Sequence, residues 1–136
     1  MRVLFDTNVF ISIFVFKSKH LGQMLHFIGV NHQIVMCSYV LDELEEVVKA
    51  KFPSKLNALD AFLASIPFEY FYSPKEHPEA LNFEIRDKDD VDVLYSAILS
   101  GVDILITGDK DFADVDIEKP EILTPAQFIE SYMEQA

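Results

Sequence analysis

Residues 2–12 have the sequence RVLFDTNVFIS, and this stretch decides the fold. The run Arg2–Phe5 predicts a short buried strand that ends at Asp6. The segment at residues 9–16 is apolar around its whole circumference, which predicts a helix that is fully buried or covered by a partner. A buried strand that turns directly into a helix is typical of an α/β fold.

Strands and helices continue to alternate along the rest of the chain. Short apolar or aromatic segments predict further strands at residues 33–37, 68–72, 103–107 and 121–123. Helical spacing of apolar residues predicts helices at residues 20–29, 38–51, 56–64, 89–100 and 125–132. Ser38 is the expected N-cap of the helix at 38–51, and residues 75–86 are expected to be a polar connection. This alternation predicts a mostly parallel sheet of four to five strands with helices on both faces.

The composition indicates one packed domain over residues 1–136. The length suits a single domain, half of the residues are hydrophobic, and no repeat or linker divides the chain. Cys37 is the only cysteine, so no intramolecular disulfide can form and a reducing compartment is expected. The N-terminus has no secretion signal, and the longest apolar run is far too short to span a membrane. We therefore expect a cytoplasmic protein that is not inserted in a membrane.

The formal net charge of −12 restricts the function. Proteins that bind nucleic acid by neutralising its phosphates usually carry basic patches. Either this chain does not bind nucleic acid, or its acids are concentrated where cations neutralise them. Its lysines form either a local basic patch or a scatter over the surface; those concerned are Lys17, Lys19, Lys49, Lys51 and Lys55.

Asp6 stands at the end of the first expected strand, where two roles are open. Its carboxylate can cap the helix that follows, or it can be a metal ligand. In the second case Thr7 and Asn8 are expected to orient the ligand or the substrate through hydrogen bonds.

The helix expected at 38–51 contains four acids, and its apolar stripe discriminates among them. At about 100° per residue, Asp42 and Glu46 project away from that stripe. Glu45 has a lysine four residues on and suits a surface ion pair. Glu43 flanks the stripe at the end nearer the preceding strand, and we predict that it is the acid that reaches the site.

A second group of acids lies in the sequence RDKDDVD at residues 86–92. Acids in the first turn of a helix complement its dipole, so most of them need no catalytic role. Asp90 precedes Leu94 by one turn, on the side expected to pack against the sheet, whereas Asp92 precedes Ser96 on a more polar side. We therefore predict Asp90 as the ligand.

The last acids lie in TGDKDF at residues 107–112. Asp109 stands two residues beyond the expected strand, and Gly108 permits close approach of another backbone there. Asp111 is either an additional ligand through water or a turn residue.

The four selected acids need a counter-charge. Carboxylates gathered within about 5 Å of one another repel by roughly 3 kcal/mol per pair at an effective dielectric near 20. A divalent cation is the natural partner, and ligands that are all oxygen favour Mg²⁺ or Mn²⁺ over zinc. Such a centre suits metal-assisted hydrolysis of phosphodiesters.

These motifs resemble the PIN-domain family, and within it the prokaryotic toxin branch related to VapC. The resemblance rests on DTNVFIS at 6–12, SYVLDELEEVV at 38–48, RDKDDVDVLYSAILSGVDILITGDKDF at 86–112 and EILTPAQFI at 121–129. It implies a three-layer α/β/α sandwich and an endoribonuclease that cleaves single-stranded RNA with Mg²⁺ or Mn²⁺. It also implies the toxin component of a type II toxin–antitoxin pair, with a small antitoxin protein as partner and a homodimer as assembly.

The resemblance also assigns residues. The family's four acids fall on Asp6, Glu43, Asp90 and Asp109. Asp111 matches an acid that is sometimes counted with the site, and Thr107 matches a hydroxyl residue common before the fourth acid. Many relatives have asparagine where Val91 stands, a departure that does not affect the acids.

Two alternatives stand beside the toxin ribonuclease. One is a catalytically weak, metal-binding PIN-like domain that acts through a protein partner, and the other is a housekeeping RNA-processing nuclease. A phosphoacceptor receiver domain needs paired acids after the first strand, and a haloacid-dehalogenase-like phosphatase needs an aspartate where Asn8 stands. The phenylalanine-rich segment at 9–16 is the candidate contact with an antitoxin or a second copy.

Overall fold

The structure, a computed structural model, describes all residues except 75–87, 110–111, 113–114, 116 and 135–136, and only the backbone of 88–90. In this part of the chain, five parallel strands form one sheet in the order β3-β2-β1-β4-β5. The strands are β1 (Arg2–Phe5), β2 (Gln33–Cys37), β3 (Phe68–Phe71), β4 (Ile104–Ile106) and β5 (Glu121–Leu123). Because the strands are parallel, their carboxyl ends meet at one edge of the sheet, the carboxyl edge. The strand order reverses between β1 and β4.

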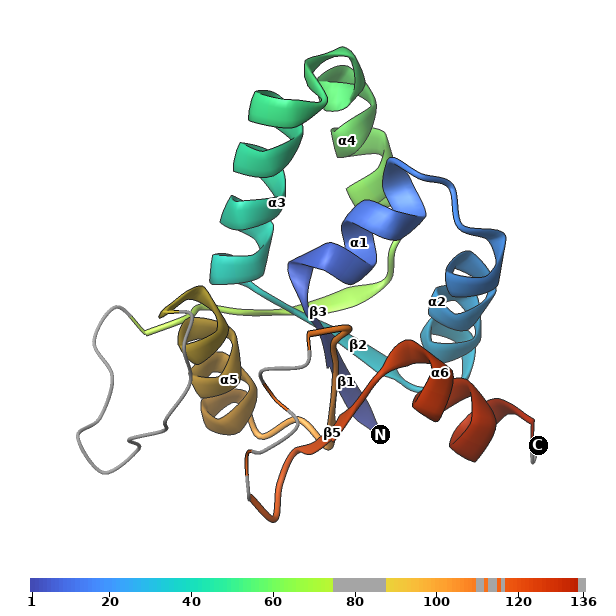
Figure 1. The fold of residues 1–136 in the computed structure, drawn as a ribbon, viewed down its shortest axis with the longest axis vertical. Helices are drawn as coiled ribbons and strands as arrows, with labels where there is room; N and C mark the ends of the chain where they lie inside the picture. The colour runs from blue at the N-terminus through green and yellow to red at the C-terminus, as the bar shows by residue number, and fades with distance from the viewer. Residues whose placement is uncertain (75–87, 110–111, 113–114, 116, 135–136) are drawn as a thin grey trace.

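Helices cover both faces of the sheet (Figure 1). Helix α5 lies on one side, and α2 and α6 lie on the other. The helices are α1 (Thr7–Phe14), α2 (Lys19–Asn31), α3 (Ser38–Lys51), α4 (Leu56–Ala64), α5 (Lys88–Ser100) and α6 (Pro125–Phe128), with a 3-10 helix η1 (Pro53–Lys55) and a π-helical turn η3 (Ile129–Met133). No helix in the described ranges is both long enough and apolar enough to cross a membrane.

The central strand β1 is buried because both faces of the sheet are covered. Val3 and Leu4 have no exposed surface although consecutive side chains point to opposite faces. Phe5 packs against Phe10 of α1 with ring centroids 5.4 Å apart. A strand with two buried faces needs an uninterrupted apolar run, which is what residues 3–5 provide.

The structure confirms the α/β class and the parallel sheet, and it corrects several predicted bounds. β2, α4 and β5 begin and end at the predicted residues. α1 lies two residues earlier than predicted. Phe16 beyond its end is 68% exposed, which contradicts a fully buried segment and leaves the other predicted alternative, cover by a partner, as a prediction. The helix predicted at 125–132 divides into α6 and η3. The connection predicted at 75–86 lies outside the described residues.

The prediction that Ser38 caps α3 is also wrong. Ser38 is the first residue of α3, and the N-cap is Cys37, which makes no side-chain capping bond. The Ser38 hydroxyl instead accepts a hydrogen bond from the backbone N–H of Ser73 at 2.8 Å. A long-range partner therefore replaces the local capping bond.

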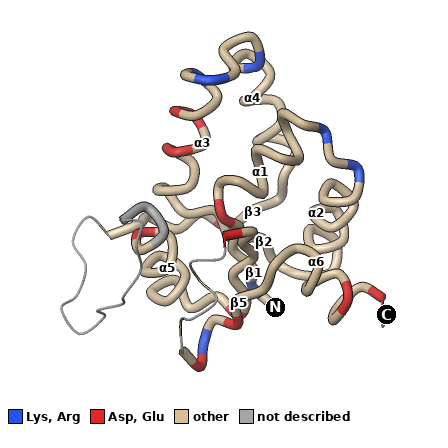
Figure 2. Tube along the Cα trace, in the orientation of Figure 1, with Lys and Arg blue, Asp and Glu red and all other residues tan. Residues whose placement is uncertain are grey.

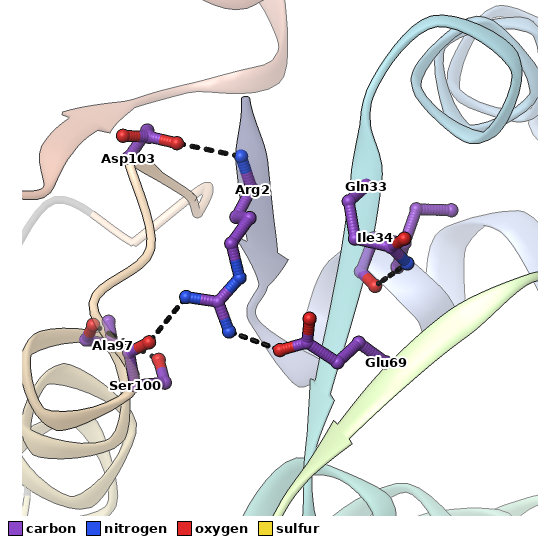
Figure 3. A network of polar contacts seen from close by, with 7 residues as sticks. All are labelled: Arg2, Gln33, Ile34, Glu69, Ala97, Ser100 and Asp103. Atoms are coloured by element: carbon purple, nitrogen blue, oxygen red, sulfur yellow. Dashed lines mark hydrogen bonds and ion pairs between the residues drawn. The ribbon is translucent and has the colours of Figure 1, made fainter.

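Arg2 joins three elements at the opposite edge of the sheet, where the strands begin (Figure 3). Its guanidinium donates to the Ser100 carbonyl at the end of α5, at 2.5 Å, and pairs with Glu69 of β3. Its backbone N–H donates to Asp103 Oδ2 at 2.8 Å. Gly101, with a φ of 71°, ends α5 directly after that carbonyl, where a cation also complements the helix dipole.

Replacing Arg2 with Leu removes both side-chain contacts of this network. We expect the free energy of unfolding to fall by about 1 kcal/mol, because the groups are partly exposed and water screens them. Urea denaturation at low salt measures the change. Lys119→Met, which removes only an exposed ion pair with Asp103 at 3.4 Å, is the control and should cost less. Equal losses in the two variants would show that the two contacts of Arg2 together contribute no more than one exposed ion pair.

Candidate active site

Asp6 lies where the strand order reverses, directly after the central strand. The register pairs Phe5 of β1 with Ile106 of β4, and the Asp6 N–H donates to the Ile106 carbonyl at 2.9 Å. Asp6 therefore lies beside Thr107, the residue that follows β4, and it is only 4% exposed. Ligands of open parallel sheets bind at this kind of position.

Both carboxylate oxygens of Asp6 accept hydrogen bonds. Oδ1 accepts from the Thr7 N–H at 2.7 Å, and Oδ2 accepts from the Thr107 hydroxyl at 2.9 Å. The Thr107 hydroxyl in turn accepts from the Asp109 N–H at 3.1 Å. Asp6 is thus the N-cap of α1, one of the two roles left open by the sequence. Each of its oxygens retains acceptor capacity, so capping does not exclude a ligand role.

The electrostatic surroundings of Asp6 disfavour its charge. Burial raises the pKa of Asp6 above its ordinary value. The hydrogen bonds from Thr107 and Thr7 oppose the rise, and the negative charges of Glu43 and Asp109 add to it. Two of the other predicted acids, from two different segments, therefore act on the charge of Asp6.

Glu43 is the inward-facing acid of α3, as its spacing predicted. It is partly buried, whereas Asp42, Glu45 and Glu46 are exposed. The Tyr39 hydroxyl, one turn earlier, donates to Glu43 Oε2 at 3.1 Å. The helix thus presents one acid to the interior and three to solvent.

The remaining predicted acids are described only in part. Asp109 is partly buried after β4, close to Asp6 through Thr107. Asp90 lies in the first turn of α5, but its side chain is outside the described residues, and so is the whole of Asp111. Leu94, one turn beyond Asp90, is fully buried, as expected for the side that packs on the sheet.

A cluster of serines that the sequence did not suggest joins α3, α5 and the segment after β3 at the carboxyl edge. The backbone N–H of Ser73 donates to Ser38, as described above. The Ser73 hydroxyl accepts from the Tyr39 N–H at 3.1 Å and also bonds to the Ser96 hydroxyl at 2.9 Å. Ser96 is fully buried, although its side of α5 was expected to be the more polar one. The one indication of this cluster in the sequence was that Ser38 and Ser73 both stand near the ends of expected strands, which meet at the same edge of a parallel sheet.

Thr7 and Asn8, which were predicted to orient ligand or substrate, differ in the structure. The Thr7 hydroxyl is buried beside Asp6 and has no hydrogen-bond partner among the residues that the structure describes. Asn8 is exposed, and its carbonyl accepts from the Ser12 hydroxyl at 3.0 Å. A buried hydroxyl without a partner destabilises the free protein.

The described side chains do not by themselves complete a metal centre. Among them, no three acidic, histidine or cysteine side chains are grouped closely enough to hold an ion. Asp6, Glu43 and Asp109 nevertheless supply only carboxylate oxygens, and the charges of Glu43 and Asp109 both act on Asp6. This donor chemistry fits a hard cation such as Mg²⁺ or Mn²⁺.

Comparison with known proteins gives one family and similar structures. The model of the PIN domain family matches residues 2–111. The VapBC2 structure from Rickettsia felis, bound to a DNA fragment from its promoter, contains a chain with TM-score 0.67 and 20% identity, over 90% of this chain and 97% of that one. A toxin–antitoxin complex from Klebsiella pneumoniae gives TM-score 0.63 and 25% identity, over the same shares. A search of curated proteins finds no match.

Thr107→Val tests the hydrogen bonds around Asp6. Asp6 loses a donor and the Asp109 N–H loses an acceptor, so we expect the free energy of unfolding to fall by about 2 kcal/mol in urea denaturation. Thr7→Val is the matched control. Because the Thr7 hydroxyl has no partner in the described part of the chain, this variant should be as stable as the wild type or more stable. Similar losses in both variants would contradict the described arrangement.

The raised pKa of Asp6 also predicts a pH dependence of stability. The Asp6 contribution is fully present below the ordinary value of 3.8 and is lost as the pH rises through the higher folded-state pKa. With a chelator present, Asp6→Asn should therefore be more stable than the wild type near neutral pH. The difference should shrink as the pH falls toward about 4. A stability difference that does not change with pH in urea denaturation would contradict this assignment.

Proposed function

The chain belongs to the PIN domain family, and we propose that it is a divalent-metal-dependent endoribonuclease that cleaves single-stranded RNA in the cytoplasm. PIN domains are generally nucleases, which supports phosphodiester hydrolysis as the reaction class. We further propose that residues 1–136 act as one domain and as the toxin of a type II toxin–antitoxin pair. The similar Klebsiella pneumoniae structure, itself a toxin–antitoxin complex, supports that role.

The observation that carries the proposal is the buried carboxylate of Asp6 at the carboxyl edge. Its pKa is raised first by burial and then by the charges of Glu43 and Asp109. A buried carboxylate whose charge is disfavoured by neighbouring acids is stabilised by a cation. The proposed ligands are Asp6, Glu43, Asp90 and Asp109, with Asp111 as a further candidate. When bound, a divalent cation stabilises negative charge on a phosphodiester and lowers the pKa of a water molecule.

The protein's own hydroxyl groups hold these acids in place. Thr107 fixes Asp6 through Oδ2 and fixes the backbone of Asp109 through its N–H. The Tyr39 hydroxyl fixes the carboxylate of Glu43 by a hydrogen bond to Oε2. Ligands that are already oriented lose less freedom when they bind. The Thr7 hydroxyl supplies a further buried hydrogen-bonding group beside Asp6.

An apolar groove of about 450 Å³, formed by residues of α1, α2 and α4, supports a protein partner. Ile13, Leu25, Phe62 and Val30 line it, and Val30 is exposed. An apolar hollow at the surface is a common site of contact with a partner. We assign the antitoxin to this groove and propose that the protein forms a homodimer. In the segment at 9–16, which the sequence predicted as such a contact, Phe10 is fully buried in the core and Phe16 is exposed.

Substitution of the inward acid of α3 tests the catalytic proposal. The purified protein should cleave unstructured RNA in millimolar Mg²⁺ or Mn²⁺, and Glu43→Gln should slow cleavage by about 100-fold because a ligand is lost. Asp6→Asn should abolish it. Glu46→Gln makes the same change of charge on the exposed side of the same helix, and it should cleave at the wild-type rate.

Thermal unfolding separates metal binding from cleavage. Divalent cations should raise the Tm of the wild type and of Glu46→Gln, and should raise it less in Asp90→Asn and Glu43→Gln. A wild-type Tm that does not respond to metal, or cleavage that survives Asp6→Asn, would exclude the proposed site.

A further inference from the structure

A second groove, of about 350 Å³, opens at the carboxyl edge beside the edge strand β3. We call it the tyrosine groove. Residues of α3, α5 and the end of β3 form it, and these elements come together in Figure 1. Its principal residues are Tyr39, Asp42, Tyr70, Tyr72, Ser73 and Asp92.

Two tyrosines of this groove are open to solvent. Tyr70 is 49% exposed and Tyr72 is 71% exposed. The register pairs Phe71 of β3 with Cys37 of β2, so Tyr72 lies level with Ser38 at the start of α3. Aromatic rings this exposed contribute little to the core, and their faces can accept a planar ligand.

The groove is attached to the acid site by hydrogen bonds. Tyr39 in its wall donates to Glu43 Oε2 at 3.1 Å. Ser73, also in its wall, bonds to Ser38, to the Tyr39 N–H and to Ser96, which fixes the segment after β3 against α3 and α5. A ligand in the groove is therefore held at a defined place relative to Glu43.

The charges of the groove favour a nucleobase over a phosphate. Asp42 and Asp92 line it, and the described lining residues include no lysine or arginine. Carboxylates repel phosphate, but they accept hydrogen bonds from amino groups such as N4 of cytosine. An unpaired base in single-stranded RNA offers both its face and that edge.

We propose that the tyrosine groove binds one unpaired base of the RNA. The base stacks on Tyr72 or Tyr70, and Asp42 accepts a hydrogen bond from its amino group. The proposal rests on the proposed ribonuclease function and adds a base-recognition element to it. Because Tyr39 joins the groove to Glu43, the bound base brings the adjoining backbone to the acid site.

Binding of short RNA tests the groove separately from cleavage. All proteins carry Asp6→Asn and are titrated in Mg²⁺ with oligocytidine or oligouridine of ten nucleotides, and a gel confirms that the RNA stays intact. The chain has five tyrosines and no tryptophan, so tyrosine emission reports stacking directly. We expect Tyr72→Leu to raise the Kd for oligocytidine by about tenfold, the effect of one lost stack. Tyr72→Phe keeps the aromatic face and should bind like the parent, and the same contrast should hold at Tyr70 if that ring carries the stack.

The preference between the two oligonucleotides tests the carboxylate. Oligocytidine should bind more tightly than oligouridine, whose O4 is an acceptor, and Asp42→Asn should reduce that difference. The proposal is overturned if Leu at both tyrosines leaves the Kd unchanged, or if Phe weakens binding as much as Leu. If the wild type cleaves RNA but the Leu variants have an unchanged Kd, only the proposed base binding in the groove is rejected. If binding depends on the tyrosines but the wild type does not cleave RNA, the ribonuclease proposal is rejected and base binding in the groove is retained.

Discussion

The hydrogen bond from Thr107 to Asp6 is the contact on which the candidate site depends. It joins residues 101 positions apart, across the two strands between which the strand order reverses. Asp6 can lie there only because β1 is central and covered on both faces. The same burial raises the pKa of Asp6, and the bonds from Thr107 and Thr7 offset only part of that effect. The packing that buries β1 therefore also disfavours the negative charge of Asp6. A bound cation is the simplest way to stabilise that charge.

Charged side chains have different kinds of partner at the two ends of the sheet. Where the strands begin, Arg2, Glu69 and Asp103 satisfy one another within the chain (Figure 3). At the carboxyl edge, Asp6 and Glu43 are hydrogen-bonded by neutral hydroxyl groups, which orient a carboxylate without neutralising it. An opposite charge in that place would stabilise the free protein and would compete with a cation. The first arrangement contributes to folding, and the second leaves the carboxylates free to act on a bound partner.

The elements that sequence could predict are those set by local periodicity. β2, α4 and β5 follow from runs of apolar residues, and the orientation of Glu43 follows from its angle to the stripe of α3. The features that could not be predicted from the sequence are hydrogen bonds and burial that depend on residues far away in the chain. The Ser38 hydroxyl has its partner in Ser73, 35 residues away, and the buried Ser96 hydroxyl bonds to the same residue. The lone hydroxyl of Thr7 is likewise a result of how β1 and α1 pack, which no spacing rule contains.

The acidity of the chain bears on the proposed binding of RNA. Figure 2 shows the described lysines of the α1–α2 connection and those around the end of α3 as two groups away from the carboxyl edge. Phosphate neutralisation at that edge therefore depends on a cation or on residues outside the described ranges. Base stacking needs no opposite charge, and a carboxylate helps it by accepting from amino groups. Tyr70, Tyr72 and Asp42, which line the tyrosine groove, are the residues proposed to supply that kind of affinity. In an acidic nuclease, a groove that binds a base would bring the adjoining phosphodiester close to the acids of the site. Those acids would repel the phosphodiester until a cation is bound.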